Sequence, residues 1–129
     1  MIFDPAEFIP APAQGALAVQ ARQADTEMLQ ILKVIDDPAS REMCMAERRV
    51  LETTGCGCRA PVGAFARITG GEMTISAFIS DTQGVRFIKK QICGPAANWQ
   101  SLADKLANEL LDAGGRDILT ELEKQNGRC

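Results

Sequence analysis

The chain has no histidine, which removes histidine-based catalysis and every histidine-containing zinc site. Its 14 Lys and Arg residues are outnumbered by 17 Asp and Glu residues and form no basic block, so no nucleic-acid partner is expected. No apolar run approaches the roughly 20 residues of a membrane span, and the first residues lack the features of a signal peptide. Because the five cysteines are an odd number, a reducing cytoplasm is the simplest location.

The first fifteen residues hold three prolines, Pro5, Pro10 and Pro12, without any hydrophobic period. Because proline lacks an amide hydrogen, this stretch is neither a helix nor a central strand, and it is typical of a connection. Residues 16–21 are short and mostly apolar, which predicts a buried strand that Arg22 closes. No neighbouring segment is suited to pair with it. Such an orphan strand is unusual in a self-contained domain.

Two amphipathic helices are predicted next. Asp25 suits the N-cap of a helix that runs to about residue 35, and its apolar face consists of Met28, Leu32 and Ile35. Asp37 and Pro38 are a typical start for a second helix, which runs to about residue 53 and is stopped by Gly55. Its inward face is apolar and consists of Met43, Ala46 and Val50. Its other face is charged and consists of Arg41, Glu42, Glu47, Arg48 and Arg49.

Three strands follow, over residues 62–68, 73–80 and about 85–92. The links between them are short and contain glycine, which favours antiparallel hairpins. The second strand alternates, and one side of it consists of Met73, Ile75, Ala77 and Ile79. The sequence Cys93-Gly94-Pro95 is expected to break the third strand.

A long helix capped by Asn98 is predicted to reach about residue 112, and its apolar stripe consists of Trp99, Leu102, Leu106 and Leu110. Gly114 and Gly115 are expected to end it, and a last short helix contains Ile118, Leu119 and Leu122. The sequence therefore predicts an α+β fold. A three-stranded antiparallel sheet is covered on one face by helices and preceded by the orphan strand.

Residues 55–63, which read GCGCRAPVG, hold two cysteines and three glycines between a predicted helix and a predicted strand. A glycine-rich loop between rigid elements is a suitable place for a reactive thiol. Arg48 and Arg59 lie close to Cys58 in sequence, and a nearby guanidinium favours the thiolate, which is the nucleophile. The alternative is that Cys58 is a small, buried and inert residue.

Other sites are open to two interpretations. Cys56 and Cys58 could form half of a metal site, but the remaining cysteines are scattered singly, so no metal is expected. Cys44 and Cys93 are expected to be packing residues. Arg22, Arg48 and Arg59 could bind carboxylates in the bidentate manner of guanidinium, or could be solvated surface residues. The Gln14 amide could contact a ligand, or could belong to a turn.

Three segments carry a resemblance to a known family. Residues 12–18, PAQGALA, followed by Arg22, resemble a segment of porphobilinogen deaminase, also called hydroxymethylbilane synthase. Residues 46–48, AER, resemble its AER motif, and residues 57–63, GCRAPVG, resemble its cofactor loop. The order of the motifs matches, and so does the step from Arg48 to Cys58. The resemblance covers essentially the whole chain, but only the C-terminal part of the family's enzyme.

This resemblance implies how the chain is divided. The family's enzyme has three domains. Residues 1–24 would be a connecting segment with the last strand of domain 1, and residues 25–129 would be the C-terminal, cofactor-anchoring domain. Domains 1 and 2, which are absent here, would be the partners of this chain. They also carry the family's catalytic aspartate and most of its substrate-binding arginines, so the resemblance predicts that this chain alone is inactive.

The resemblance also implies a chemistry. The family joins four porphobilinogen molecules head to tail with loss of ammonia, in the synthesis of tetrapyrroles such as heme. A dipyrromethane cofactor, held by a thioether, starts the growing polypyrrole chain, and a soft thiolate such as that of Cys58 suits this bond. The cofactor-binding residues would then be Cys58, Gly57, Arg22, Arg48 and Gln14. Cys56 departs from the family pattern, in which glycine is frequent. The alternative is a non-catalytic ligand-binding or interaction module that kept the fold.

Overall fold

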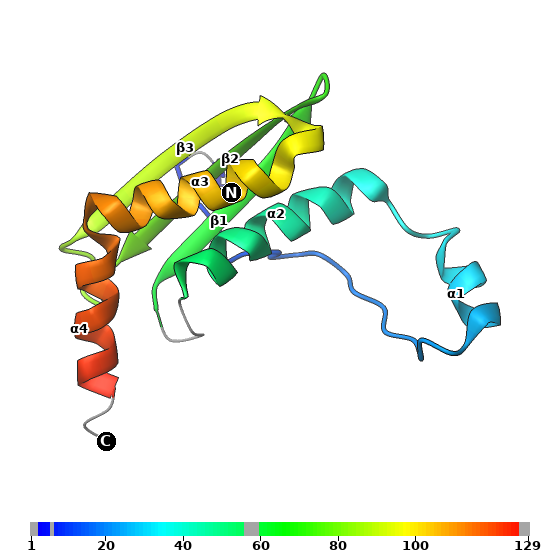
Figure 1. Ribbon diagram of the computed structural model, residues 1–129, viewed down its shortest axis with the longest axis horizontal. Coiled ribbons are helices and arrows are strands. Elements are labelled where there is room, and N and C mark those ends of the chain that lie inside the picture. Colours follow the sequence, from blue (N-terminus) through cyan, green and yellow to red (C-terminus); the bar gives the residue numbers. More distant parts are fainter. Residues whose placement is uncertain (1–2, 6, 56–59, 127–129) are drawn as a thin grey trace.

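Three antiparallel strands form the centre of the computed structural model, which describes residues 3–5, 7–55 and 60–126 (Figure 1). The strands pair in chain order, and their bounds are β1 (Val62–Thr69), β2 (Glu72–Ser80) and β3 (Phe87–Pro95). The register pairs Thr69 with Glu72 and Ser80 with Phe87. The first hairpin turns at Gly70 and Gly71, both with positive φ, which suits a two-residue turn between antiparallel strands. The predicted antiparallel sheet is confirmed.

Two helices cover one face of this sheet, α2 (Pro38–Thr54) and α3 (Trp99–Leu110) (Figure 1). α2 begins as the sequence predicted, because the Asp37 carboxylate accepts a hydrogen bond from the Ser40 amide at 3.1 Å. It ends at Gly55, whose left-handed conformation (φ 67°) is the usual helix stop of glycine. α3 follows a short 3₁₀ turn, but the Asn98 side chain makes no capping hydrogen bond to it.

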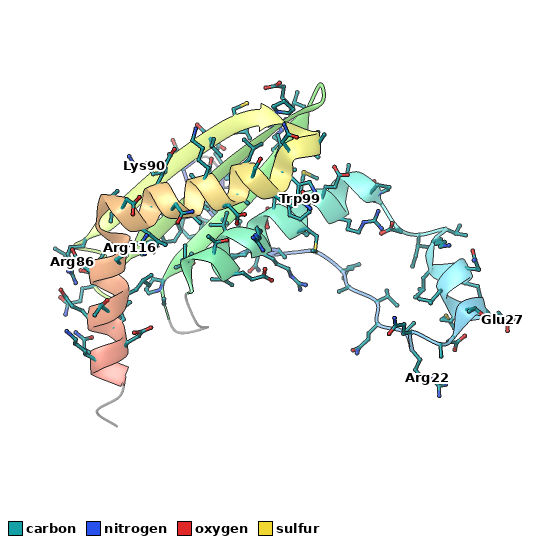
Figure 2. The ribbon with its side chains drawn as sticks, viewed as in Figure 1. Arg22, Glu27, Arg86, Lys90, Trp99 and Arg116 are labelled. Carbon is teal, nitrogen blue, oxygen red and sulfur yellow. The ribbon has the colours of Figure 1, made fainter. Side chains whose placement is uncertain are left out.

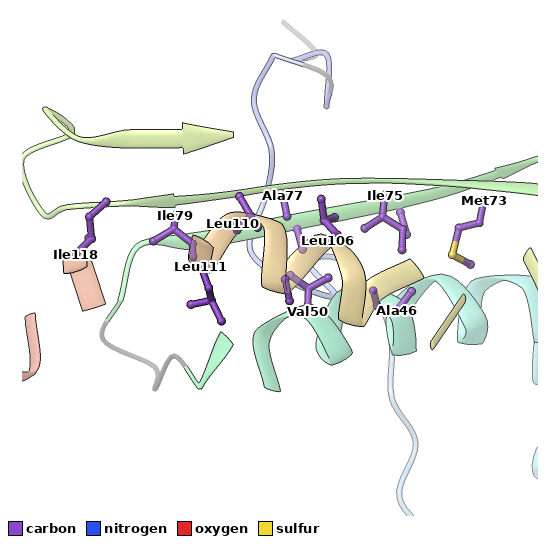
Figure 3. Packing of buried hydrophobic residues seen from close by; sticks show 14 of the residues in the cluster. Ala46, Val50, Met73, Ile75, Ala77, Ile79, Leu106, Leu110, Leu111 and Ile118 are labelled. Atoms are coloured by element: carbon purple, nitrogen blue, oxygen red, sulfur yellow. The ribbon is translucent and has the colours of Figure 1, made fainter. Parts of the chain in front are cut away.

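The hydrophobic core lies between the sheet and these two helices (Figure 3). The predicted inward side of β2 is fully buried, since all four of its residues have no exposed surface: Met73, Ile75, Ala77 and Ile79. From α2, Ala46 and Val50 are equally buried, as predicted. α3 contributes a buried face that consists of Ala103, Leu106, Ala107 and Leu110. Apolar spacing therefore identified the inward side of β2 correctly, and also the inward residues Ala46, Val50, Leu106 and Leu110. Trp99 and Leu102, which were expected on the same stripe, are only half-buried.

The third strand differs from its prediction at both ends. β3 begins at Phe87 and continues through Pro95, so the sequence Cys93-Gly94-Pro95 does not break it. Proline is tolerated there because β3 is an edge strand and Pro95 is its last residue. Cys93 is exposed and is therefore not the packing residue that we expected.

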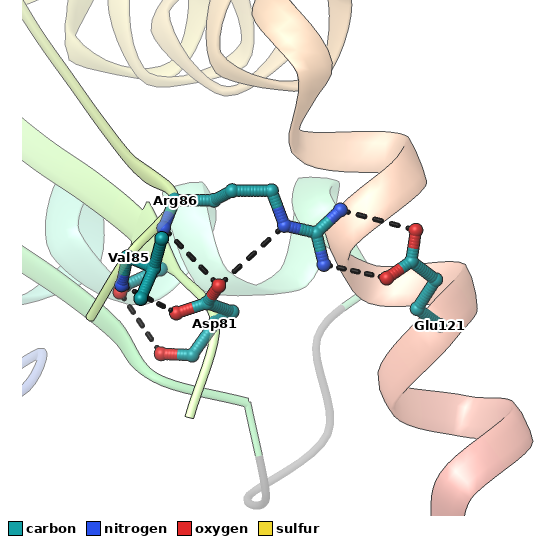
Figure 4. A network of polar contacts seen from close by, with 5 residues as sticks. Asp81, Val85, Arg86 and Glu121 are labelled. Carbon is teal, nitrogen blue, oxygen red and sulfur yellow. Dashed lines mark hydrogen bonds and ion pairs between the residues drawn. The ribbon is translucent and has the colours of Figure 1, made fainter. Parts of the chain in front are cut away.

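The chain continues from α3 through a π-helical turn (Leu111–Gly115) into α4 (Arg116–Asn126). Gly114 has a φ of 113°, and α4 runs in a different direction from α3 (Figure 1). The two glycines therefore redirect the chain where the sequence predicted an end. Ile118 and Leu122 attach α4 to the core. The Arg86 guanidinium also binds the Glu121 carboxylate of α4, at 2.6 and 3.0 Å, and contacts Asp81 (Figure 4).

The segment before α2 has two parts. Residues 7–15, called the connection below, pass close to β1. Residues 16–35, called the arm, extend away from the sheet and contain the short helix α1 (Thr26–Leu32) (Figure 1). Asp25 caps α1 as predicted, since its carboxylate accepts from the Met28 amide at 3.1 Å. However, α1 ends at Leu32 rather than near residue 35, and none of its residues is buried.

The predicted buried strand over residues 16–21 is not present. These residues form no strand in the structure, and the side chains of Leu17 and Val19 are 98% and 62% exposed. The physical reason is that a strand needs a hydrogen-bonded neighbour, and the described residues supply none for this segment. The interpretation of residues 16–22 as part of another domain therefore stays a prediction.

Gly63 allows the connection to approach the sheet. A Cβ atom at this position would lie 2.3 Å from a ring carbon of Phe78 and 2.9 Å from the Pro10 carbonyl oxygen. Both contacts are shorter than van der Waals contact allows. The Ala64 amide donates to the same carbonyl at 3.1 Å, so the backbone of the connection packs directly on β1.

We predict that Gly63→Ala lowers the free energy of unfolding by about 1–3 kcal/mol, because the added methyl group must displace Pro10 or Phe78. Urea unfolding followed by Trp99 fluorescence measures this change. Gly94→Ala is the matched control, since its Cβ would meet only the end of the Leu102 side chain, at 2.9 Å. A loss at Gly63 no larger than the loss at Gly94 would contradict the close approach of the connection.

Candidate functional site

The ends of the cysteine loop are fixed by regular structure. α2 leads into the loop at Gly55, and β1 begins after it at Val62. The Pro61 carbonyl accepts from the Ser80 amide at 3.0 Å, so the contact between β1 and β2 extends to the residue before β1. Cys58 and Gly57, the expected anchor and its neighbour, lie outside the described residues. The structure therefore defines where the loop begins and ends.

Glu47 is the main correction to the expected site. The sequence placed it on the charged outer face of α2, but the residue is buried, with 6% of its surface exposed. Its Oε1 atom accepts from the Ala66 amide at 2.8 Å, and its Oε2 atom accepts from the Ala13 amide at 2.5 Å. Both acceptor oxygens of this inward carboxylate therefore bind backbone amides.

Helical spacing could have identified Glu47. The inward residues of α2 are Met43, Ala46 and Val50, and position 47 completes the spacing i, i+3, i+4, i+7 that defines a buried helical face. The charge of the side chain argued against this assignment, because carboxylates are rarely buried without partners. The partners are amides of segments far away in sequence, which sequence spacing does not reveal.

The carboxylate and the connection together cover the free edge of β1. Ala64 and Ala66 direct their amides away from β2. The first donates to the Pro10 carbonyl and the second to Glu47. An edge strand with unsatisfied amides is costly when it is partly buried. Both amides therefore have partners, and the connection is held against the strand that follows the cysteine loop.

Gln14 lies in a tight turn directly after this contact. The turn is closed by two hydrogen bonds, from the Gln14 amide to the Ala11 carbonyl at 3.0 Å and from the Ala16 amide to the Ala13 carbonyl at 3.2 Å. Ala13 has a φ of 59°, the single positive φ among the described non-glycine residues. Gln14 is exposed and adjoins the point where the connection contacts α2.

The arginines of the chain differ in whether a carboxylate already binds them. Arg49 on α2 makes a bidentate contact with Asp104 of α3, at 2.7 and 3.0 Å, and hydrogen bonds from Arg49 and Thr53 lower the pKa of Asp104. Arg48, the next residue toward Glu47, is exposed and makes no hydrogen bond or ion pair with any described residue. Its guanidinium is thus available to an anion.

Arg22 is exposed as well, but it lies on the arm, far from the sheet (Figure 2). It borders an open depression of about 430 Å³ whose lining is Arg22, Ala24, Asp25, Thr26 and Glu27. The structure therefore brings Gln14 and Arg48 to the region of α2 and leaves Arg22 apart from them.

The two described cysteines do not compete for the role expected of Cys58. Cys44 is half-buried, and burial together with the charge of Glu47 raises the pKa of its thiol, against the smaller effect of Arg48. Its thiolate is accordingly disfavoured. Cys93 contacts Glu72 and Thr74 on strands remote from the loop ends.

The described part of the chain contains neither a metal-binding cluster nor a helix that could cross a membrane. No group of three or more cysteine, aspartate or glutamate residues there has an arrangement that could hold a metal ion. None of the helices in the same residues combines the length and hydrophobicity that a membrane crossing requires. Cys56 and Cys58 are not among the residues to which these two findings apply.

Residues 41–112 match the family profile described as "Porphobilinogen deaminase, C-terminal domain". The chain belongs to this family. The match contains most of α2, the cysteine loop, the whole sheet and α3. It therefore includes two of the three segments that carry the sequence resemblance, residues 46–48 and 57–63. The predicted membership of the porphobilinogen deaminase family is confirmed.

Similar proteins include porphobilinogen deaminases from several organisms. The chain is 42% identical over 118 residues to that of Roseiflexus castenholzii and 39% identical over 129 residues to that of Acidothermus cellulolyticus. A protein named probable porphobilinogen deaminase, from Nitrosopumilus maritimus, is 38% identical over 112 residues. These matches cover 92%, 97% and 87% of the chain but only 39%, 39% and 36% of the relatives. The chain thus spans about two fifths of their length.

The ionisation of Glu47 predicts a pH dependence of stability. Burial raises the pKa of this carboxyl group above its ordinary value of 4.5, against the opposing effect of the two amide hydrogen bonds. The folded protein therefore keeps the proton at a pH where the unfolded chain has lost it. By linkage, the free energy of unfolding falls as the pH rises from the ordinary pKa through the raised one, and is constant above it.

Measuring this contribution requires a reference that cannot ionise at position 47, which Glu47→Gln provides. We predict that the free energy of unfolding of the wild type, relative to that of this variant, decreases as the pH rises from about 4 to about 8. Urea unfolding at a series of pH values determines the free energy of unfolding of the wild type and of the variant. A difference that is constant or increases with pH would contradict the raised pKa.

Proposed function

We propose that this chain is the cofactor-anchoring part of a porphobilinogen deaminase, the enzyme that joins four porphobilinogen molecules into hydroxymethylbilane with loss of ammonia. The observation that carries the proposal is the family match over residues 41–112, which includes the cysteine loop. The fold supports it, since the loop lies between the end of α2 and the start of β1, two elements held together by the core.

In this proposal the sulfur of Cys58 would hold the dipyrromethane cofactor through a thioether. Sulfur is a soft nucleophile and suits a bond to carbon that must persist through repeated cycles. When bound, the dipyrromethane supplies the free pyrrole carbon on which the chain grows. The covalent bond holds the growing chain in one place, so each addition becomes effectively intramolecular. We assign Gly57, the neighbour of Cys58 in sequence, to the same site, because glycine has no side chain that could obstruct a ligand.

Residues on α2, the helix that leads into the loop, and on the connection suit a cofactor rich in carboxylates. Each pyrrole carries two, so guanidinium groups without a protein partner are required nearby. The Arg48 guanidinium has no protein partner among the described residues, whereas Arg49 is already bound by Asp104. The negative charge of Glu47 is directed inward to two amides rather than toward the loop. Gln14, exposed after the contact between the connection and α2, provides an uncharged amide for the same ligand.

Arg22 takes part in this proposal only in the complete enzyme. We assign residues 1–24 to the connection with domain 1, whose last strand would be residues 16–22, and residues 25–129 to the C-terminal domain. The exposed side chains of Leu17 and Val19 support this division, because a sheet in the missing part would bury them. Docking of that part would also change the position of Arg22.

We predict that the isolated chain does not form hydroxymethylbilane from porphobilinogen. It spans only about two fifths of its relatives, and the aspartate that serves the family as catalytic group lies in the missing part. An assay with purified chain and porphobilinogen measures this directly. Product formation by the chain without any partner protein would overturn the prediction.

A second prediction concerns the thiol. Mass spectrometry of the protein from its natural source should show a dipyrromethane adduct on the peptide that contains Cys58. The adduct should be lost in Cys58→Ser and retained in Cys56→Ser, which is the matched control two residues away.

The alternative functions predict different masses. An unmodified Cys58 in the wild-type protein, once loss during purification is excluded, would favour a non-catalytic ligand-binding module. An adduct on Cys56 instead would overturn the assignment of the anchor.

A further inference from the structure

Glu47 connects three segments of the chain. The residue belongs to α2, which leads into the cysteine loop. Its Oε1 atom binds the Ala66 amide of β1, the strand that leaves the loop, and its Oε2 atom binds the Ala13 amide of the connection. One buried carboxylate therefore contacts both elements that border the loop and the residue that precedes Gln14.

We propose that Glu47 is a positioning residue of the cofactor site, whose two carboxylate oxygens fix the turn that carries Gln14 against α2 and β1. The reference to a cofactor site rests on the function proposed above. The contact itself does not, and it is testable separately. Arg48 is the next residue on the same helix, so Glu47 also fixes the start of its side chain relative to Gln14.

The geometry requires a carboxylate. Two amides approach two oxygen atoms, and both oxygens of a carboxylate accept, whereas the amide of glutamine has one acceptor and one donor group. In Glu47→Gln, one backbone amide therefore faces an NH₂ group and loses its partner. Ala13 is the amide more easily released, because Ala66 belongs to a paired strand and Ala13 has the unfavourable φ of 59°.

The core of the domain does not depend on this contact. Ile75 and Ile79 are fully buried between the sheet and the helices by apolar packing. Glu47 lies where α2 meets the connection and the edge of β1. Removing its charge should therefore release the connection and leave the central strand in place. This difference separates a positioning role from a general contribution to stability.

Nuclear magnetic resonance of the complete 129-residue chain tests the inference. In the wild type, a long-range HNCO experiment should show couplings from the Ala13 and Ala66 amide nitrogens to the Glu47 carboxyl carbon. In Glu47→Gln, hydrogen exchange at Ala13 should accelerate by about tenfold or more, the effect expected when a charge-assisted hydrogen bond is lost. Exchange at Ile75 and Ile79 should accelerate much less than exchange at Ala13.

Glu52→Gln is the matched control, since it removes an exposed carboxylate from the same helix and should leave exchange at Ala13 unchanged. The inference is overturned if the wild type shows no coupling to Ala13. It is also overturned if exchange at Ala13 is equal in the two variants, or if exchange at the core amides accelerates as much as at Ala13. The coupling experiment needs no variant, so it tests the contact even if Glu47→Gln does not fold.

The same two variants test whether the contact of Glu47 affects the proposed cofactor site. When they are produced in the natural source, Glu47→Gln should carry less adduct on Cys58 than Glu52→Gln, because Gln14 and Arg48 are no longer fixed together. Equal adduct in the two variants, with the couplings present, would remove the positioning role and leave a structural contact. A wild-type protein without adduct would instead contradict the proposed function, and the couplings would still test the contact.

Discussion

The free edge of β1 is the constraint that organises this part of the molecule. An edge strand directs every second amide away from its sheet, and each such amide needs a partner if water is excluded. Here Ala64 and Ala66 obtain theirs from the Pro10 carbonyl and the Glu47 carboxylate. The same two contacts hold the connection and α2 against β1. The packing of α2 and the connection against β1 is therefore tied to satisfying the backbone of one strand.

Local sequence patterns predicted most of the helices and strands of the domain. The alternation of Met73, Ile75, Ala77 and Ile79 and the sequence Asp37-Pro38 depend on neighbouring residues, so periodicity and capping were sufficient. Glu47 was assigned wrongly, because its partners lie 19 and 34 positions away and sequence spacing carries no information on them. The predicted strand over residues 16–21 had the right composition, but strand formation also needs a partner. Of the expected site residues, Arg48 lies on α2 and Gln14 follows the contact between the connection and α2. The role of Cys58 remains a prediction.

The arm exposes apolar side chains that the rest of the described chain does not bury. Val34 and Ile35 are 84% and 68% exposed, and α1 has no buried residue. Single apolar residues on a surface are ordinary, but several in one short segment are typical of a surface that another element covers. This pattern agrees with a chain that spans about two fifths of its relatives. It supports the proposal that the arm contacts the missing part of a deaminase.

The contact between Ala13 and Glu47 also has a consequence for the order of folding. The β1–β2 hairpin closes over a two-residue turn, and such local contacts form early. The connection, in contrast, reaches Glu47 across 34 positions and needs β1 already in place to receive the Pro10 carbonyl. During synthesis from the N-terminus, the connection leaves the ribosome long before its docking surface exists. We expect it to join the domain last, so that refolding of the body precedes the docking of the segment that carries Gln14.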